Sequence, residues 1–268
     1  MKKTYFRPWI DRRRIVIFFI TTILLLLAPL IFDLGTASKW LLWITSIPFA
    51  FITFRLIFTY NQLAPSGGNY QEKIYDVAVD YFDVSTGSAL DIGTLSGAVP
   101  IKLAKKYPKL KISAVDNWRD KVLIKPRESK NKKKKTRKIL TGLEECENNA
   151  EVFGVSKNIK FTKHSLGHLP YKDSEFNGII SVLSFQQAPH DDKLGLLREA
   201  LRVLEEDGEF VFIDLFNDES TFGNLDDLLT KLKVSEVEAK PLSDLIHLPK
   251  LLMAKSSLGN AVLIKGHK

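Results

Sequence analysis

The chain has 268 residues, an ordinary apolar fraction of 45% and a formal net charge of +8. This length suits one domain with a folded core plus a smaller element, and the single cysteine, Cys146, excludes an internal disulfide and fits a reducing compartment. Much of the positive charge lies in residues 2–14 and 130–138, so its position has to decide between nucleic acid, an anionic membrane surface and neither.

Two apolar runs follow the basic N-terminus. Residues 15–32 carry no charged side chain, residues 33–39 form a polar break, and residues 40–58 are apolar except for Arg55. Each run approaches the ~20 residues that a helix needs to cross a bilayer. Prolines inside the runs and aromatic side chains beside them are both compatible with membrane helices. We therefore predict a membrane anchor over residues 1–60, with two transmembrane helices at about 15–32 and 40–58.

The charges around these runs predict their orientation. Basic residues precede the first run, the connecting segment is nearly neutral, and Arg55 lies near the end of the second run. Because cytoplasmic flanks are enriched in Lys and Arg, we expect a multi-pass protein of the cell membrane with both termini cytoplasmic. A cleaved signal peptide is the alternative for the first run, but no small-residue cleavage site follows it. Membrane lipid is the expected partner of residues 15–58.

A linker and a soluble α/β domain are predicted after the anchor. Residues 61–69 contain Pro65, Gly67 and Gly68, which are typical of a linker, and the domain covers residues 70–268. The periodicity predicts helices over 71–82, 144–153, 191–204 and 225–232, and strands over 111–115, 159–163, 178–183 and 209–215, with a closing pair of strands at 234–239 and 261–265. This alternation predicts a mostly parallel sheet with helices on both faces.

The start of this domain has the plan of a βαβ unit that holds a nucleoside at its strand tips. An apolar run ends in Asp91, a turn with Gly93 and Gly97 follows, and after an amphipathic segment a second apolar run ends in Asp116. The glycines that dinucleotide oxidoreductases need are missing, and Asp91 would repel a pyrophosphate. Asp91 can instead receive an ammonium, Asp116 can accept ribose hydroxyls, and a helix N-terminus can receive a carboxylate. S-adenosylmethionine carries all three groups.

Several motifs resemble one known family. The stretch Asp91-Ile-Gly-Thr-Leu-Ser-Gly97 resembles the first motif of class I S-adenosylmethionine-dependent methyltransferases, and Asp116 resembles their ribose-binding acid. Residues 147–155 and 169–181 resemble the stretch that leads to the family's fourth strand, and residues 197–210 resemble the helix and turn before its fifth strand. The resemblance implies a Rossmann-like class I methyltransferase fold preceded by the two-helix transmembrane hairpin. It also implies S-adenosylmethionine as cosubstrate.

The resemblance implies a set of cosubstrate-binding residues, and it shows three departures from the family pattern. The implied residues are Asp91, Ile92, Gly93, Thr94, Ser96, Gly97, Asp116, Asn117, Ser165, Leu166 and Ser181. Leu95 stands where a glycine is usual, Ser165 where an acid accepts from the adenine amino group, and Asn177 where an aspartate is usual. If position 95 needs a positive φ, leucine costs about 1–2 kcal/mol there. A degenerate, non-catalytic binding module at the membrane is therefore the alternative to an active methyltransferase.

Methyl transfer requires mainly that the enzyme align the acceptor with the methyl group and exclude water. His190 is the candidate general base, and the alternative is an exposed histidine at the head of a helix that Asp191 caps. Cys146 is expected to pack rather than to react, and no metal-ligand spacing is present, so no metal is expected. A small or lipid-soluble acceptor is favoured, and the sequence does not identify it.

Residues 130–138 form a dense run of lysines. Like charges repel, so this run is expected to be an exposed loop or a frayed helix start. Contact with anionic lipid headgroups is a second interpretation, in which each basic residue near the membrane surface contributes about 1 kcal/mol. Nucleic acid is the least favoured partner, because no interleaved aromatic residues or nucleic-acid-binding fold accompany the lysines.

Overall fold

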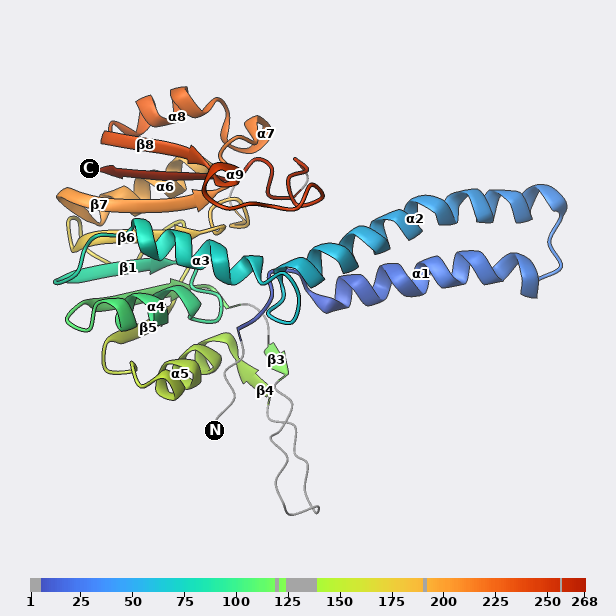
Figure 1. The fold of residues 1–268 in the computed structure, drawn as a ribbon, viewed down its shortest axis with the longest axis horizontal. Coiled ribbons are helices and arrows are strands. Elements are labelled where there is room, and N and C mark those ends of the chain that lie inside the picture. Colours follow the sequence, from blue (N-terminus) through green and yellow to red (C-terminus); the bar gives the residue numbers. More distant parts are fainter. Residues whose placement is uncertain (1–5, 119–120, 124–138, 190–191, 256) are drawn as a thin grey trace, which may run out of the picture. The chain divides into compact units, whose positions relative to one another are not determined.

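A computed structural model describes residues 6–118, 121–123, 139–189, 192–255 and 257–268. The chain divides into two compact units, and Figure 1 labels the elements of both. The second unit consists of Pro8–Lys73 and Pro249–Leu252, and the first unit consists of Ile74–Leu248 and Met253–Lys268 together with the N-terminal residues through Arg7. The lysine run at 130–138 and the candidate base His190 lie outside the described residues.

The second unit is built on a hairpin of two long helices, α1 (Arg12–Ile31) and α2 (Thr36–Leu63). Small polar side chains lie between them, since the hydroxyls of Thr22 and Thr53 are buried and 3.1 Å apart. Each threonine also bonds a carbonyl of its own helix, one turn earlier. Both hydroxyls are therefore satisfied inside an otherwise apolar hairpin.

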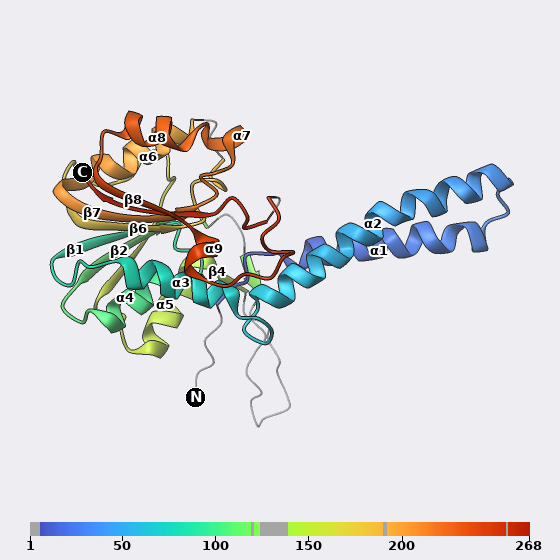
Figure 2. The same cartoon turned by 45° about the horizontal axis from the view of Figure 1, so that its top comes forward.

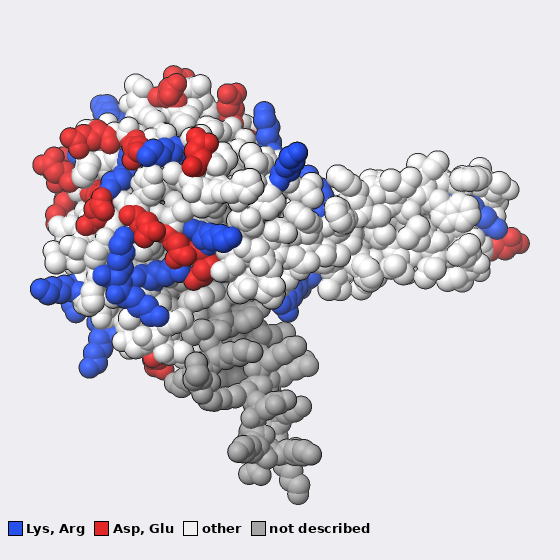
Figure 3. Space-filling model, viewed as in Figure 1, with Lys and Arg blue, Asp and Glu red and all other residues white. Residues whose placement is uncertain are grey.

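The outer surface of the hairpin is covered by large apolar side chains. Leu30 and Ile31 are each 70% exposed. On the face drawn in Figure 3, Lys, Arg, Asp and Glu lie towards the two ends of the hairpin, and its middle part shows none. The most apolar 18-residue stretches of α1 and α2 have mean hydropathies of 2.5 and 1.8, and only 11% of each stretch is buried. Both helices are therefore long and apolar enough to cross a membrane.

The first unit contains a mixed seven-stranded sheet in the order β5-β2-β1-β6-β7-β9-β8. Its strands are β1 (Ser88–Ile92), β2 (Lys111–Asp116), β5 (Ile159–Lys163), β6 (Phe176–Val182), β7 (Leu204–Asp214), β8 (Ser235–Pro241) and β9 (Val262–His267). The first five in this order run parallel, and β9 and β8 close the sheet by antiparallel pairing. This confirms the predicted α/β fold with a mostly parallel sheet.

A second, two-stranded sheet was not predicted from the sequence. It pairs β3 (Lys121–Leu123) with β4 (Ile139–Thr141), two short strands at either end of the lysine-rich segment. Strands of three residues give too little alternation to be read from a pattern.

Helices cover both faces of the large sheet, as Figure 2 shows: α6 (Lys193–Arg202), α7 (Glu219–Phe222) and α8 (Leu225–Leu232) on one face, α3 (Tyr70–Tyr81), α4 (Ala98–Lys106) and α5 (Gly142–Phe153) on the other. A further short helix, α9 (Leu242–Leu245), follows β8. The N-cap of α6 is Asp192, whose Oδ1 accepts the N–H of Gly195 at 2.8 Å. Sequence reasoning had placed this cap at Asp191, which lies outside the described residues.

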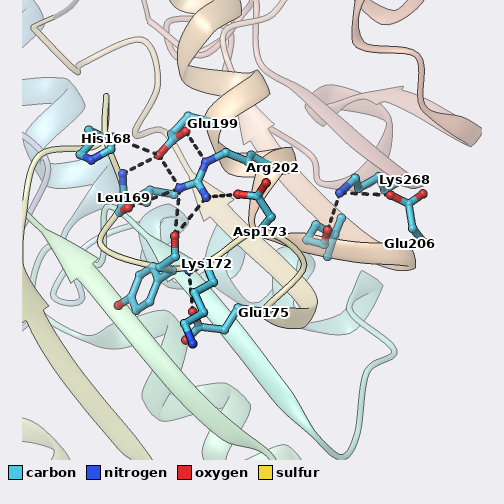
Figure 4. Close-up of polar contacts among 11 residues, drawn as sticks. His168, Leu169, Lys172, Asp173, Glu175, Glu199, Arg202, Glu206 and Lys268 are labelled. Carbon is cyan, nitrogen blue, oxygen red and sulfur yellow. Dashed lines mark hydrogen bonds and ion pairs between the residues drawn. The ribbon is translucent and has the colours of Figure 1, made fainter.

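Arg202, at the end of α6, ties the turn before β6 to this helix (Figure 4). Its guanidinium donates to both oxygens of Glu199, at 2.8 and 2.9 Å, and to the carbonyl of Tyr171 at 3.1 Å. Glu199 in turn accepts the backbone N–H of Leu169 at 2.6 Å. The hydrogen bonds from Arg202 hold the pKa of Glu199 below its ordinary value, against a smaller opposing effect of burial.

We expect Arg202→Lys to lower the free energy of unfolding by about 1–2 kcal/mol, because an ammonium cannot reproduce the forked donation to Glu199 and to the turn. Chemical denaturation of the full chain measures this change. Arg198→Lys is the matched control, since Arg198 is exposed on the same helix and should change stability by less than about 0.5 kcal/mol. Equal effects of the two substitutions would contradict the proposed role of the network.

Candidate functional site

The candidate site is built around the turn that joins β1 to α4. The N–H of Gly93 donates to the carbonyl of Val115 at 2.8 Å, which fixes the start of the turn against the end of β2. Gly93 and Gly97 have φ values of 77° and 83°, in the left-handed region. A Cβ at Gly93 would also overlap the side chain of Ser184. The backbone therefore requires glycine at position 93, and the conformation strongly favours it at position 97.

Asp91 lies near the end of β1, with its side chain enclosed by the protein. The residue is 1% exposed, and burial raises the pKa of its carboxyl group to about 7, with a smaller opposing effect from the neighbouring hydroxyl of Thr94. Among the described residues, Oδ2 of Asp91 and Oγ1 of Thr94 have no well-formed hydrogen bond. Such groups are costly to bury unless a ligand completes them. This carboxylate and hydroxyl can receive a cationic or hydrogen-bond-donating ligand.

Leu95 adopts the strained conformation that the sequence made conditional. Its φ is 52°, so leucine carries a cost of about 1–2 kcal/mol at a position suited to glycine. Neighbouring groups hold this conformation. The N–H of Leu95 donates to Oδ2 of Asp116 at 2.9 Å, and its carbonyl accepts the indole N–H of Trp118 at 2.8 Å. The tips of β1 and β2 are thereby joined through Leu95.

Trp118 was not among the residues predicted from the sequence. It is 6% exposed, its φ is 31°, and its backbone N–H donates to Oδ1 of Asp116 at 3.1 Å. Its only signal in the sequence is its place two residues after Asp116, with the predicted Asn117 between them. The structure shows that Trp118 helps to fix both the acidic side chain and the turn.

Helix α5 holds the same turn from another side. The side-chain amide of Asn149 donates to the carbonyl of Ser96 at 3.0 Å, and the thiol of Cys146 lies 3.4 Å from the carbonyl of Leu95. Burial, followed by the nearby carboxylate of Glu145, raises the pKa of Cys146 well above its ordinary value. The environment of Cys146 is therefore that of a packed thiol rather than a nucleophile.

The other predicted site residues differ in their surroundings. Ser181, at the end of β6, is buried and donates to the carbonyl of Ile92 at 3.0 Å, so its hydroxyl links two strands. Ser165 is exposed, and Leu166 packs against the core next to it. Both follow His164, whose backbone N–H donates to the carbonyl of Asp116 at 3.0 Å. The structure thus brings Ser165 and Leu166 to the edge of the sheet where Asp116 lies.

Asn177 belongs to the opposite edge of the sheet. It lies at the amino end of β6, where its Oδ1 accepts the N–H of Ser88 at 2.8 Å and its Nδ2 donates to Glu205 at 2.5 Å. Asn177, which departs from the family pattern, therefore has a structural role: it accepts a hydrogen bond from the start of β1. It has no bearing on the groups around Asp91.

Two charged residues that sequence reasoning missed fix the segment after β6. Asp214 is fully buried and accepts the N–H groups of Phe185 and Gln186 at 2.8 and 3.2 Å, and burial raises its pKa to about 6. Lys193 donates to three carbonyls of the same segment, including that of Ala188 at 2.7 Å. This segment carries Ser184 against Gly93. Within the described ranges, no group of three or more His, Cys, Asp or Glu side chains could hold a metal ion.

Comparisons with known proteins identify the fold and a methyltransferase domain. A family profile described as a methyltransferase domain matches residues 90–212, and no curated protein matches the chain. A putative S-adenosylmethionine-dependent methyltransferase from Methanococcus maripaludis is similar at 16% identity and a TM-score of 0.50, covering 74% of this chain and 84% of that one. Geranyl diphosphate methyltransferase in complex with SAM is similar at 10% identity and a TM-score of 0.51, covering 73% and 84%.

A third similar structure is that of a protein named for a different activity. The [4+2]-cyclase SpnF is similar at 13% identity and a TM-score of 0.52, covering 74% of this chain and 81% of that one. Identities this low establish the shared fold alone. The profile match adds the methyltransferase domain, and S-adenosylmethionine is the cosubstrate that such a domain indicates. Residues 90–212 of this chain therefore form a methyltransferase domain, and the whole domain has the fold of S-adenosylmethionine-dependent methyltransferases.

Proposed function

We propose that this protein binds S-adenosylmethionine at the tips of β1 and β2 and transfers its methyl group to an acceptor. The observation that carries the proposal is the buried carboxylate of Asp91, whose Oδ2 has no well-formed hydrogen bond among the described residues. An ammonium group of the ligand would supply the missing positive charge and hydrogen bonds. The methyltransferase domain matched over residues 90–212 supports this assignment of the ligand.

The neighbouring groups would fix the remaining parts of the ligand. The N-terminus of α4, which begins after Gly97, presents backbone N–H groups to a carboxylate. Asp116 would accept ribose hydroxyls beside Asn117, and Ser165 and Leu166 would contact the adenine. Bound S-adenosylmethionine would supply a methyl group for in-line displacement by the acceptor. The protein's own contribution is alignment and the exclusion of water, with His190 as the proposed base if the acceptor must lose a proton.

We further propose that the hairpin anchors the domain in the cell membrane. Residues 1–60 would form the anchor, residues 61–69 the linker and residues 70–268 the methyltransferase domain, with both termini in the cytoplasm. The exposed apolar side chains of α1 and α2 support this proposal, because exposing so large an apolar surface to water is unfavourable. A domain held at a bilayer favours a small or lipid-soluble acceptor. The lysines at 130–138 would then meet anionic lipid headgroups.

A non-catalytic binding module is the second candidate. The strained φ of Leu95 favours it, because the leucine side chain stands where the family usually has no side chain at all. The similarity to a protein named as a cyclase is compatible with this alternative, since one fold hosts several chemistries. In this alternative the site would bind a ligand at the membrane without transferring a methyl group.

Equilibrium dialysis of the full chain with labelled S-adenosylmethionine tests the site directly. We expect the affinity to fall as the pH is lowered from 7 to 5.5, approaching tenfold per pH unit, because a carboxyl with a pKa of about 7 must lose its proton to receive an ammonium. Asp91→Asn should weaken binding tenfold or more and remove this pH dependence.

Asp80→Asn is the control for this experiment, since Asp80 is an exposed acid on α3. It should leave the affinity unchanged at every pH. No detectable binding by the wild-type chain at millimolar S-adenosylmethionine would refute the proposed ligand. Binding that Asp91→Asn leaves intact would refute the role of this carboxylate.

Leu95→Gly separates the two candidate functions. Leu95 is already strained without ligand, so its strain does not oppose binding, but the bulk of its side chain can. Removing the side chain should then strengthen S-adenosylmethionine binding by about fivefold or more. Lys233→Gly is the matched control, because Lys233 has a similar φ of 55° at the end of α8. Unchanged affinity after Leu95→Gly would show that leucine at this position does not impair the site.

The anchor is tested by fractionating cells that express the full chain. We expect the protein to stay with the membrane pellet after washing with alkaline carbonate and to enter solution only with detergent, because two spanning helices do not dissociate in aqueous base. Substituting arginine for Leu24 and Ile47, both exposed in the middle of the helices, should weaken this retention. Release of the wild-type protein by carbonate alone would contradict membrane insertion.

A further inference from the structure

The N-terminal segment before the hairpin contacts the turn that carries the candidate site. Nε and Nη2 of Arg7 lie 3.1 and 3.0 Å from Oε2 of Glu145, in the first half of α5. Glu145 is fully buried, and its second oxygen has no hydrogen bond within the described part of the chain. Burial raises the pKa of Glu145, while the charge and hydrogen bond of Arg7 act in the opposite direction. Arg7 thus compensates a carboxylate that the domain has buried.

The backbone of Arg7 reaches the turn itself. Its N–H donates to Oγ of Ser96 at 3.1 Å, and Ser96 is fully buried between Leu95 and Gly97. The carbonyl of Ser96 accepts from Asn149 at 3.0 Å, and Asn149 lies one helical turn after Glu145 on α5. Arg7 therefore contacts the hydroxyl of Ser96, and α5 contacts its carbonyl. The ion pair joins Arg7 to α5 itself.

The ring of Phe6 adds a packing contact to this arrangement. It stacks on Phe153, at the end of α5, with 5.7 Å between centroids and an interplanar angle of 2°. Nζ of Lys105, on α4, lies 3.9 Å from the centroid of the Phe153 ring. Residues 6 and 7 are thus held by an aromatic stack, an ion pair and a backbone hydrogen bond, although they precede the turn by almost 90 residues.

We propose that Arg7 is a positioning residue of the cosubstrate site, which holds residues 93–97 in their binding conformation through Ser96 and through Glu145 of α5. This proposal rests on the proposed function for its ligand, but the conformational part stands without it. Leu95 keeps its left-handed conformation only while its surroundings enforce it. Ser96 is the next residue, so loosening its two hydrogen bonds releases the constraint on Leu95.

The ion pair has one fully buried partner, because the side chain of Glu145 is 1% exposed and that of Arg7 is 22% exposed. A buried pair is often no more stabilising than an apolar pair of the same volume, because both charges lose their hydration. Removing only one partner is costly, since it leaves an uncompensated charge in the interior. Removing both charges therefore separates the need for compensation from the need for the contact. The backbone N–H of Arg7 remains in every variant, so the side chain is tested alone.

The experiment compares four variants of the full chain with the wild type. Arg7→Met removes the charge and keeps most of the side-chain length, Arg7→Lys keeps the charge, and Arg7→Met combined with Glu145→Gln removes both charges. Lys105→Met is the control, because Lys105 is a neighbouring basic residue that contacts Phe153 rather than Glu145. Hydrogen exchange of the peptide containing residues 93–97, the dissociation constant of S-adenosylmethionine and the thermal unfolding midpoint are measured for each.

We expect Arg7→Met to speed exchange at residues 93–97 and to raise the S-adenosylmethionine dissociation constant, each by about tenfold, the loss of one charged hydrogen bond. Arg7→Lys, which keeps the positive charge beside Glu145, should stay within about threefold of the wild type. The double variant has no ion pair, so it should resemble Arg7→Met in exchange and affinity while recovering much of the unfolding midpoint that Arg7→Met loses. Lys105→Met should change neither quantity. Exchange in strands β1 and β7 should remain slow in all variants.

Three results would overturn the proposal. Arg7→Met could match the wild type in exchange and affinity, it could speed exchange equally across β1 and β7, which would indicate a global loss of stability, or Arg7→Lys could behave like Arg7→Met. A wild-type chain that does not bind S-adenosylmethionine would refute the proposed function instead. The exchange of residues 93–97 in Arg7→Met would still decide whether Arg7 holds the turn.

Discussion

The hydrogen bond from the backbone N–H of Leu95 to the carboxylate of Asp116 is the contact around which the candidate site is arranged. It joins the ends of two neighbouring parallel strands. On the other side of the same residue, the indole N–H of Trp118 donates to the carbonyl of Leu95. The turn has to pass through left-handed conformations at three of its residues to make these contacts. That path leaves Asp91 beneath the turn, out of water and short of hydrogen bonds.

The two units satisfy the same physical requirement in opposite ways. In the first unit the large apolar side chains lie between the sheet and its helices, and Oδ2 of Asp91 and Oε1 of Glu145 are among the few buried side-chain atoms of the described residues without a hydrogen bond. In the hairpin the hydroxyls of Thr22 and Thr53 are inside and the large apolar side chains are outside. The exposed apolar side chains make both helices apolar enough to cross a membrane.

Much of the fold could be predicted because its signals are local. The strands around Asp91 and Asp116 are apolar runs bounded by turns, and helix α5 begins where the sequence has a threonine and a glutamate three residues apart. The conditional expectation for Leu95 was also correct, since position alone showed that glycine was missing. The partners of the turn could not be found in this way. Arg7 and Glu145 are 138 residues apart, and in the sequence Arg7 looks like one of several basic residues before an apolar run.

Because Arg7 belongs to the same compact unit as residues 74–248, the hairpin is in chain order an insertion within that unit and not an appendage in front of it. A water-soluble fragment made by starting after α2 would discard Phe6 and Arg7 together with the apolar helices. Glu145 would then be left in the interior without its cation. Residues 6 and 7 would have to be rejoined to the domain by a short artificial connection for such a fragment to retain its full complement of contacts.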